Sequence, residues 1–167
     1  MATRNDFSAE QWQALRNAPQ IVALATAAAG NSGLFGSISE GMAMASTMAT
    51  AMRGEQPLIR EIFGKDEIRA AQDQIKGMVK SATDKASLNT LLQKAATEAT
   101  SAALAALAAK GATADADAFR ALLAGIGQKI ANASTEGGFL GFGGERVSDG
   151  ERQFLAQLDA LVGTKKV

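Results

Sequence analysis

The stretch that decides the fold is DKASLNTLLQKAATEATSAALAALAAK, residues 84–110. Its apolar residues recur every three or four positions, which is the spacing of one face of an α-helix. Asp84 offers a capping oxygen at its start, and Gly111 ends it with a backbone that tolerates positive φ. We expect a long helix with polar Thr90, Gln93, Lys94, Thr97 and Ser101 opposite an apolar face of Leu88, Leu91, Leu92, Ala95, Ala99, Ala102, Ala103, Ala106 and Leu107.

The same helical signals recur on both sides of this stretch. Ser8 with Gln11, Ser37 with Glu40, and Ser148 with Glu151 have the spacing of capping boxes, in which the two side chains satisfy free backbone N–H groups. Pro19 either kinks the first helix or opens a second segment at that point. The predicted helices cover about residues 8–29, 37–52, 66–80, 84–110, 113–134 and 148–162, with a short helical turn at 58–63.

No segment shows the alternation of β-branched and polar residues that is typical of a half-buried strand. A chain of 167 residues can build one core. We therefore predict an all-α protein, a compact bundle of five or six helices forming one domain over residues 1–167. The helices from both ends of the chain are expected to pack around residues 84–110, and residues 163–167 to form a frayed tail.

Composition removes several classes of function. Seventeen basic and seventeen acidic side chains give a net charge of zero, which argues against a nucleic-acid or anionic-membrane partner. The chain has no Cys, His or Tyr, so it lacks thiolate zinc sites, the usual general base near neutral pH and every His-dependent triad. No paired catalytic constellation is visible, and the residue set therefore argues against an enzyme.

The N-terminal residues carry no apolar run behind their positive charge, so they do not resemble a secretory signal. The longest apolar runs, residues 21–29 and 102–109, are well short of the roughly 20 residues that cross a bilayer. We expect a cytoplasmic protein without a membrane span.

Residues 137–151, GGFLGFGGERVSDGE, depart from the alanine-rich pattern. Glycine-rich loops can bind phosphate, but no strand precedes this one and the P-loop and Rossmann spacings are both missing. One interpretation is a surface loop that folds back onto the bundle. The other is a partner-binding loop formed by Phe139, Leu140 and Phe142, because exposed aromatic residues among glycines adapt to another surface.

The two ends of the chain share a pattern. Residues 33–41 read GLFGSISEG, and GFLG at 138–141 followed by VSDG at 147–150 repeats the same order of residue types. One interpretation is a pair of helical hairpins related by a pseudo-two-fold axis. The alternative is coincidence, since glycine stops and Ser-acid starts are common at helix joints.

Val147, Ser148 and Glu151 resemble the helix joint of the TerB-type tellurite-resistance family, and residues 27–40 resemble it less clearly. The family's joint reads Ala-Asp-Gly, a variable residue, Ile or Val, Ser, two variable residues and Glu; Gly144 occupies the position of the Asp. The resemblance implies a helical bundle with acidic divalent-metal sites. Independently of it, Glu145, Asp149 and Glu151 lie close together in the sequence, and their carboxylates are candidate ligands for a hard cation. Helix capping and the helix N-terminus are the alternative explanation for Asp149 and Glu151.

Met44, Met48 and Met52 are four residues apart and predict either core filler or an adaptable apolar groove. From these observations we expect a non-enzymatic structural or protein-interaction module without an organic cofactor, which associates with itself or with a protein partner. The alternatives are a TerB-like protein that binds a divalent metal ion, and a carrier of a small apolar ligand held between helices.

Overall fold

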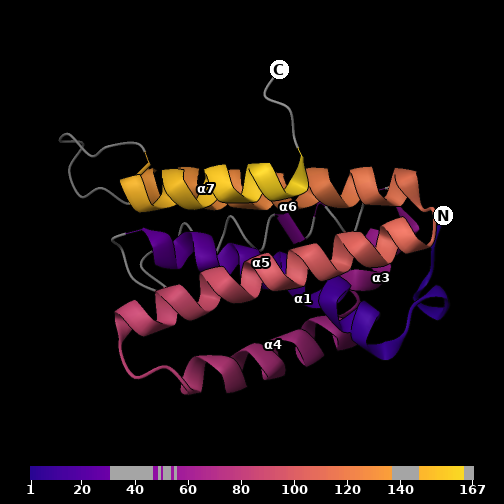
Figure 1. Ribbon diagram of the computed structural model, residues 1–167, viewed down its shortest axis with the longest axis horizontal. Coiled ribbons are helices and arrows are strands. Elements are labelled where there is room, and N and C mark those ends of the chain that lie inside the picture. The colour runs from indigo at the N-terminus through magenta and orange to yellow at the C-terminus, as the bar shows by residue number, and fades with distance from the viewer. Residues whose placement is uncertain (31–46, 49, 51–53, 55, 137–146, 164–167) are drawn as a thin grey trace.

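The computed structural model describes residues 1–30, 47, 48, 50, 54, 56–136 and 147–163, with only the backbone described at 134–136. Within these residues the chain forms a short 3-10 turn and six α-helices, and no strand (Figure 1). The predicted all-α fold is confirmed. In chain order the elements are Arg4–Asp6, α1 (Ala9–Ala29), α3 (Pro57–Ile62), α4 (Lys65–Lys80), α5 (Lys85–Ala109), α6 (Thr113–Glu136) and α7 (Asp149–Val162).

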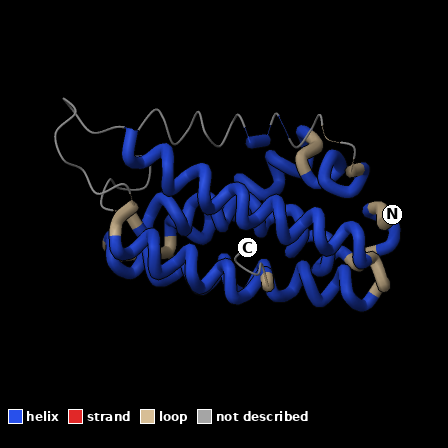
Figure 2. The backbone as a smooth tube through the Cα atoms, turned by 90° about the horizontal axis from the view of Figure 1, so that it is seen from above, coloured by secondary structure: helices blue, strands red, loops and turns tan. Residues whose placement is uncertain are grey.

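Helix α1 forms the centre of the bundle. It contacts α4, α5, α6 and α7, and Figure 2 shows the long helices lying along the same axis of the molecule. Thirteen of its residues are buried, and they include Trp12. Pro19 does not open a second segment, because α1 continues through it from Ala9 to Ala29. We predicted that residues 84–110 form the centre of the bundle, whereas α1 occupies that position.

The most extensive packing in the molecule is between α1 and α5. Small side chains line the buried part of α5, with Ala96, Thr100 and Ala103 fully buried between Leu92 and Leu107. Small residues let two helix backbones approach closely, as the alanine-rich sequence predicts. Four positions of the expected apolar face are not fully buried: Ala102 is exposed, and Leu91, Ala95 and Ala99 are only half-buried.

The short helix α3 and the residue that follows it are part of the core. Leu58, Ile62 and Phe63 are almost completely buried. Pro57 occupies the first position of α3, where its missing N–H costs nothing. Helix α4 then leaves the core at Gly64 and runs along the edge of the bundle, at the bottom of Figure 1.

Helices α6 and α7 lie side by side on the other side of the bundle (Figure 1). Gly127 of α6 faces α7 closely: a Cβ atom at that position would lie 2.8 Å from Leu155 Cδ2. Helix α7 ends at Gly163, which has a left-handed backbone conformation with a φ of 67°. The N–H of Gly163 donates a hydrogen bond to the carbonyl oxygen of Asp159. The predicted frayed tail at residues 164–167 lies outside the described residues.

Most of the helix predicted over residues 37–52 also lies outside the described residues; within it, residues 47, 48 and 50 are helical. Met48 is partly buried and packs against the hydrophobic core. Core filling is therefore confirmed for Met48, and the interpretation of Met44 and Met52 stays a prediction.

Candidate functional site

The joint at the start of α7 is built by a capping box. The Ser148 hydroxyl oxygen accepts a hydrogen bond from the Glu151 N–H at 3.2 Å. Glu151 Oε2 in turn accepts from the Ser148 N–H and from the Ser148 hydroxyl, both at 2.8 Å. The predicted cap is confirmed, and Glu151 is buried although it is an acid.

Two glycines bring this joint against the end of α1. A Cβ atom on Gly150 would lie 2.3 Å from the carbonyl oxygen of Ala29, and one on Gly30 would lie 2.9 Å from Glu151 Oε1. At Gly150 the atom met is backbone, so only a residue without a Cβ allows this approach, whereas at Gly30 it is the end of the Glu151 side chain. The carbonyl end of α1 thereby meets the N-terminal end of α7, so the opposite partial charges of the two helix ends face each other.

The predicted carboxylate candidates do not share one role in the described structure. The Asp149 side chain is 92% exposed and forms an ion pair with Arg152, whereas Glu151 is buried in the capping box. No group of three acidic side chains that could hold a metal ion occurs among the described residues. Glu145 lies outside them, so the three-residue site stays a prediction.

The partner-binding loop formed by Phe139, Leu140 and Phe142 also lies outside the described residues. The same holds for the first copy of the internal repeat, residues 33–41. Its second copy is described only at residues 147–150, which form the start of α7. The predicted pseudo-two-fold relation therefore stays a prediction.

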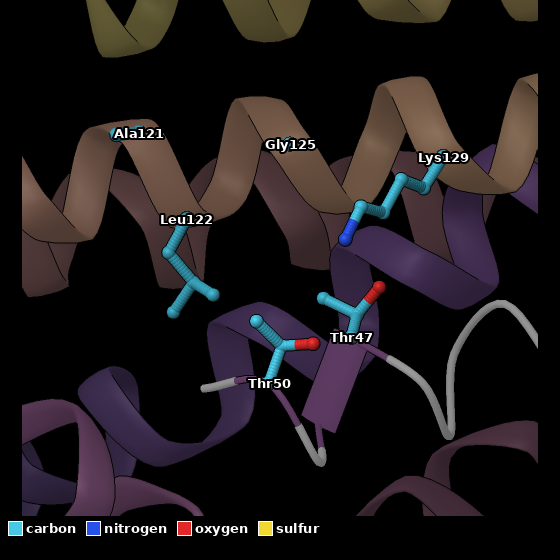
Figure 3. A pocket seen from close by; sticks show the side chains of 6 residues that line it. All are labelled: Thr47, Thr50, Ala121, Leu122, Gly125 and Lys129. Carbon is cyan, nitrogen blue, oxygen red and sulfur yellow. The ribbon is translucent and has the colours of Figure 1, made fainter. Parts of the chain in front are cut away.

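A small hollow lies between α6 and the residues Thr47 and Thr50. Its volume is about 180 Å³, and its lining consists of Thr47, Thr50, Ala121, Leu122, Gly125 and Lys129. Figure 3 shows the Leu122 side chain pointing into it, while the Lys129 ammonium group and the Thr47 side chain extend toward each other. Sites for drug-sized ligands measure about 300–1,000 Å³, so this hollow suits only a very small molecule.

A different surface is formed by small residues of α5. On the outer side of α5, Ser101, Ala102, Ala105, Ala108 and Ala109 are all exposed. No charged residue occurs on α5 between Glu98 and Lys110. The sequence signal for this surface was the run of small residues itself, but alanine is compatible with both a buried and an exposed face.

A polar cluster joins the N-terminal residues to α1 and α4. The Glu67 carboxylate of α4 pairs with the guanidinium groups of both Arg4 and Arg16, the latter at 3.3 Å. The Arg4 guanidinium also lies 5.8 Å from the centre of the Trp12 ring. Sequence reasoning missed this cluster because its members are as many as 63 positions apart.

No helix among the described residues is long and apolar enough to cross a bilayer. No protein-family model, curated protein or solved structure matches this chain. Any proposal about its function therefore depends on the surfaces and contacts described above.

Proposed function

We propose that this chain is a small cytoplasmic, non-enzymatic helical module that associates with a second copy of itself through the outer face of α5. The observation that carries the proposal is a row of exposed small residues between positions 101 and 109. We call this row the α5 face, and it consists of Ser101, Ala102, Ala105, Ala108 and Ala109. Long charged side chains usually cover the exposed face of a surface helix. This face instead carries methyl and hydroxyl groups over more than two helical turns.

The chemistry of the α5 face favours another helix as its occupant. Alanine loses no side-chain entropy on burial, and its small size lets two backbones approach closely. Nine residues of α-helix are only about 14 Å long, however, so the face alone buries less than the roughly 1,200 Å² of a standard interface. We therefore expect weak association, with dissociation constants in the micromolar range or above.

Sedimentation velocity over a range of protein concentrations tests this proposal. The wild-type chain should show a rising average mass, because mass action populates the dimer as concentration increases. Ala105→Glu places a charge in the middle of the α5 face and should keep the chain monomeric. Ala160→Glu makes the same chemical change at an exposed position of α7 and should leave association unchanged.

Two results would contradict the proposal. One is a wild-type chain that stays monomeric at every concentration. The other is loss of association in Ala160→Glu to the same extent as in Ala105→Glu, since a general charge effect would then explain both.

The TerB-like alternative predicts a divalent-metal site that includes Glu145, Asp149 and Glu151. Thermal melts with and without millimolar calcium, magnesium or manganese separate it from our proposal, since a ligand that binds only the folded state raises the midpoint. We expect an unchanged midpoint, because Ser148 and Arg152 already hold two of the three carboxylates. An increase that Asp149→Asn abolishes would favour the metal site instead.

A further inference from the structure

Helix α4 is attached to the bundle differently from the other long helices. Of its sixteen residues, all of which the structure describes, those that are buried are Glu67, Ala71 and Ile75. Ile75 is the one large apolar side chain among them, and Ile68, Met78 and Val79 are partly buried against the core. By contrast, α7 is shorter and buries Phe154, Leu158 and Val162. Apolar burial is the dominant stabilising term in packing, and α4 has fewer buried large apolar side chains than α7 has.

Polar contacts make up much of the remaining interface between α4 and α1. Asn17 Nδ2 donates to Gln74 Oε1 at 3.0 Å, and Gln20 Nε2 lies 3.5 Å from the carbonyl oxygen of Ile68. Both Asn17 and Gln20 are buried beneath α4. Water can replace these hydrogen bonds when the helices separate, so they oppose separation far less than an equal area of apolar contact does.

Helix α4 also has an intrinsic weak point. Gly77 lies near the last turn of α4 and is exposed, and a Cβ atom there would meet no atom within 4 Å. The glycine therefore has no packing role, while it lowers the helix propensity of this turn. Gly64 directly before α4 and the non-helical residues 82–84 after it supply the two connections about which the helix could turn.

The N-terminal residues carry one contact that reaches out to α4. The Ala2 N–H donates to Asp115 Oδ2 at 2.7 Å in a buried hydrogen bond, and the Arg4 N–H donates to Glu61 Oε2 at 2.8 Å. These two bonds fix the segment to α6 and to α3. The Arg4 side chain then extends over the Trp12 ring and pairs with Glu67 in the first turn of α4.

We propose that α4 is a detachable helix: it opens from the bundle as a unit while the remaining helices stay folded. The Arg4–Glu67 pair, which adds to the Arg16–Glu67 pair between α1 and α4, is the latch that helps to keep it closed. The fixed backbone of Arg4 and the low apolar burial of α4 together carry this inference. Opening exposes the Asn17 and Gln20 amides of α1, which then present hydrogen-bonding groups to the solvent. The proposal is independent of the α5 face.

Native-state hydrogen exchange, followed by mass spectrometry of the peptides, tests the opening. A unit that opens separately exchanges at a lower free energy than the global unfolding of the domain. We expect the backbone amides in the middle of α4 to exchange at least about tenfold faster than those in the middle of α5. Equal protection of α4 and α5 would overturn the detachable helix, because both would then belong to one cooperative unit.

The latch has its own pair of variants. Arg4→Ala should accelerate exchange throughout α4 by about 1.5- to 5-fold, which is the size expected from a partly exposed ion pair, and leave α5 and α7 unchanged. Arg152→Ala removes an ion pair within α7 and should leave α4 unchanged. The latch is wrong if Arg4→Ala does not accelerate α4, or if it accelerates α5 and α7 equally.

A cross-link supplies a second measurement. The natural chain contains no cysteine, so Asn17→Cys combined with Gln74→Cys introduces one defined pair. In the oxidised form, exchange in α4 should slow to the rate of α5, and reduction should restore the faster exchange. Unchanged exchange after oxidation would show that α4 does not separate from α1 when its amides exchange, and would overturn the proposal.

Discussion

Gly150→Ala is the sharpest test of the contact between the ends of α1 and α7. The added Cβ would lie 2.3 Å from the Ala29 carbonyl oxygen, so the two helix ends must move apart by about 1 Å to restore an ordinary contact. Both partners are backbone atoms of helix ends, and neither can rotate away. Overpacking of this kind costs about 1–3 kcal/mol, and the better helix propensity of alanine offsets at most about 1 kcal/mol.

The net expectation is a loss of about 1–2 kcal/mol of unfolding free energy, which corresponds to a midpoint lower by roughly 2–8 °C for a domain of this size. Thermal and urea melts followed by far-UV circular dichroism measure both quantities. Gly77→Ala is the matched control, because its Cβ enters open space and should stabilise the chain by about 0.5–1 kcal/mol. Our reasoning fails if Gly150→Ala is as stable as the wild type or more stable.

Three further predictions concern helix packing and capping. Gly127→Ala should cost less than Gly150→Ala in the same urea melts, because the atoms it meets are the movable ends of the Leu155 and Leu158 side chains; an equal or larger cost would contradict this. Ser148→Ala removes the cap of α7 and should lower the unfolding free energy by about 1 kcal/mol with an unchanged urea m-value. Hydrogen bonds from the backbone and side chain of Ser87 hold the pKa of Asp84 below 3.8. The ionised carboxylate therefore stabilises the folded chain above pH 3.8, and this stabilisation is lost as the pH falls through the lowered pKa of the folded state. Asp84→Asn keeps a capping oxygen but cannot ionise, so its melting midpoint should fall less than that of the wild type between about pH 6 and about pH 2.5, and parallel curves would refute this.

The helices and their caps were predictable because their signals are local. Ser8 with Gln11 and Ser148 with Glu151 both form capping boxes, as their three-residue spacing indicates. A capping box needs only a turn of chain, so no distant residue can change its geometry.

The faces of α5 were less predictable because alanine carries little information about burial. Ala102 and Ala103 are chemically identical neighbours, yet the first is exposed and the second is fully buried. Periodicity resolves a face only when the opposite side carries polar residues, and this part of α5 has few. The exposed α5 face could therefore be identified only from the packing of the neighbouring helices in the folded structure.

Long-range contacts at the site could not be predicted from spacing at all. In the sequence, Gly30 and Gly150 have the pattern of ordinary helix boundaries. Nothing in the chain between them indicates that the two boundaries pack against each other, or that a Cβ at either position would meet atoms of the other boundary. The Arg4–Glu67 pair has the same character, because it depends on the path of the N-terminal segment across α3. Such contacts follow from tertiary packing and leave no periodic trace in the sequence.

The central position of α1 has a consequence for synthesis of the chain. Helix α1 is synthesised before the helices that pack on it, and three of these, α5, α6 and α7, emerge only after residue 84. Until then the apolar side chains of Trp12, Leu15 and Val22 lack the core partners that these three helices supply. Apolar surface that is exposed in this way during synthesis makes a nascent chain prone to aggregation until the later helices are complete.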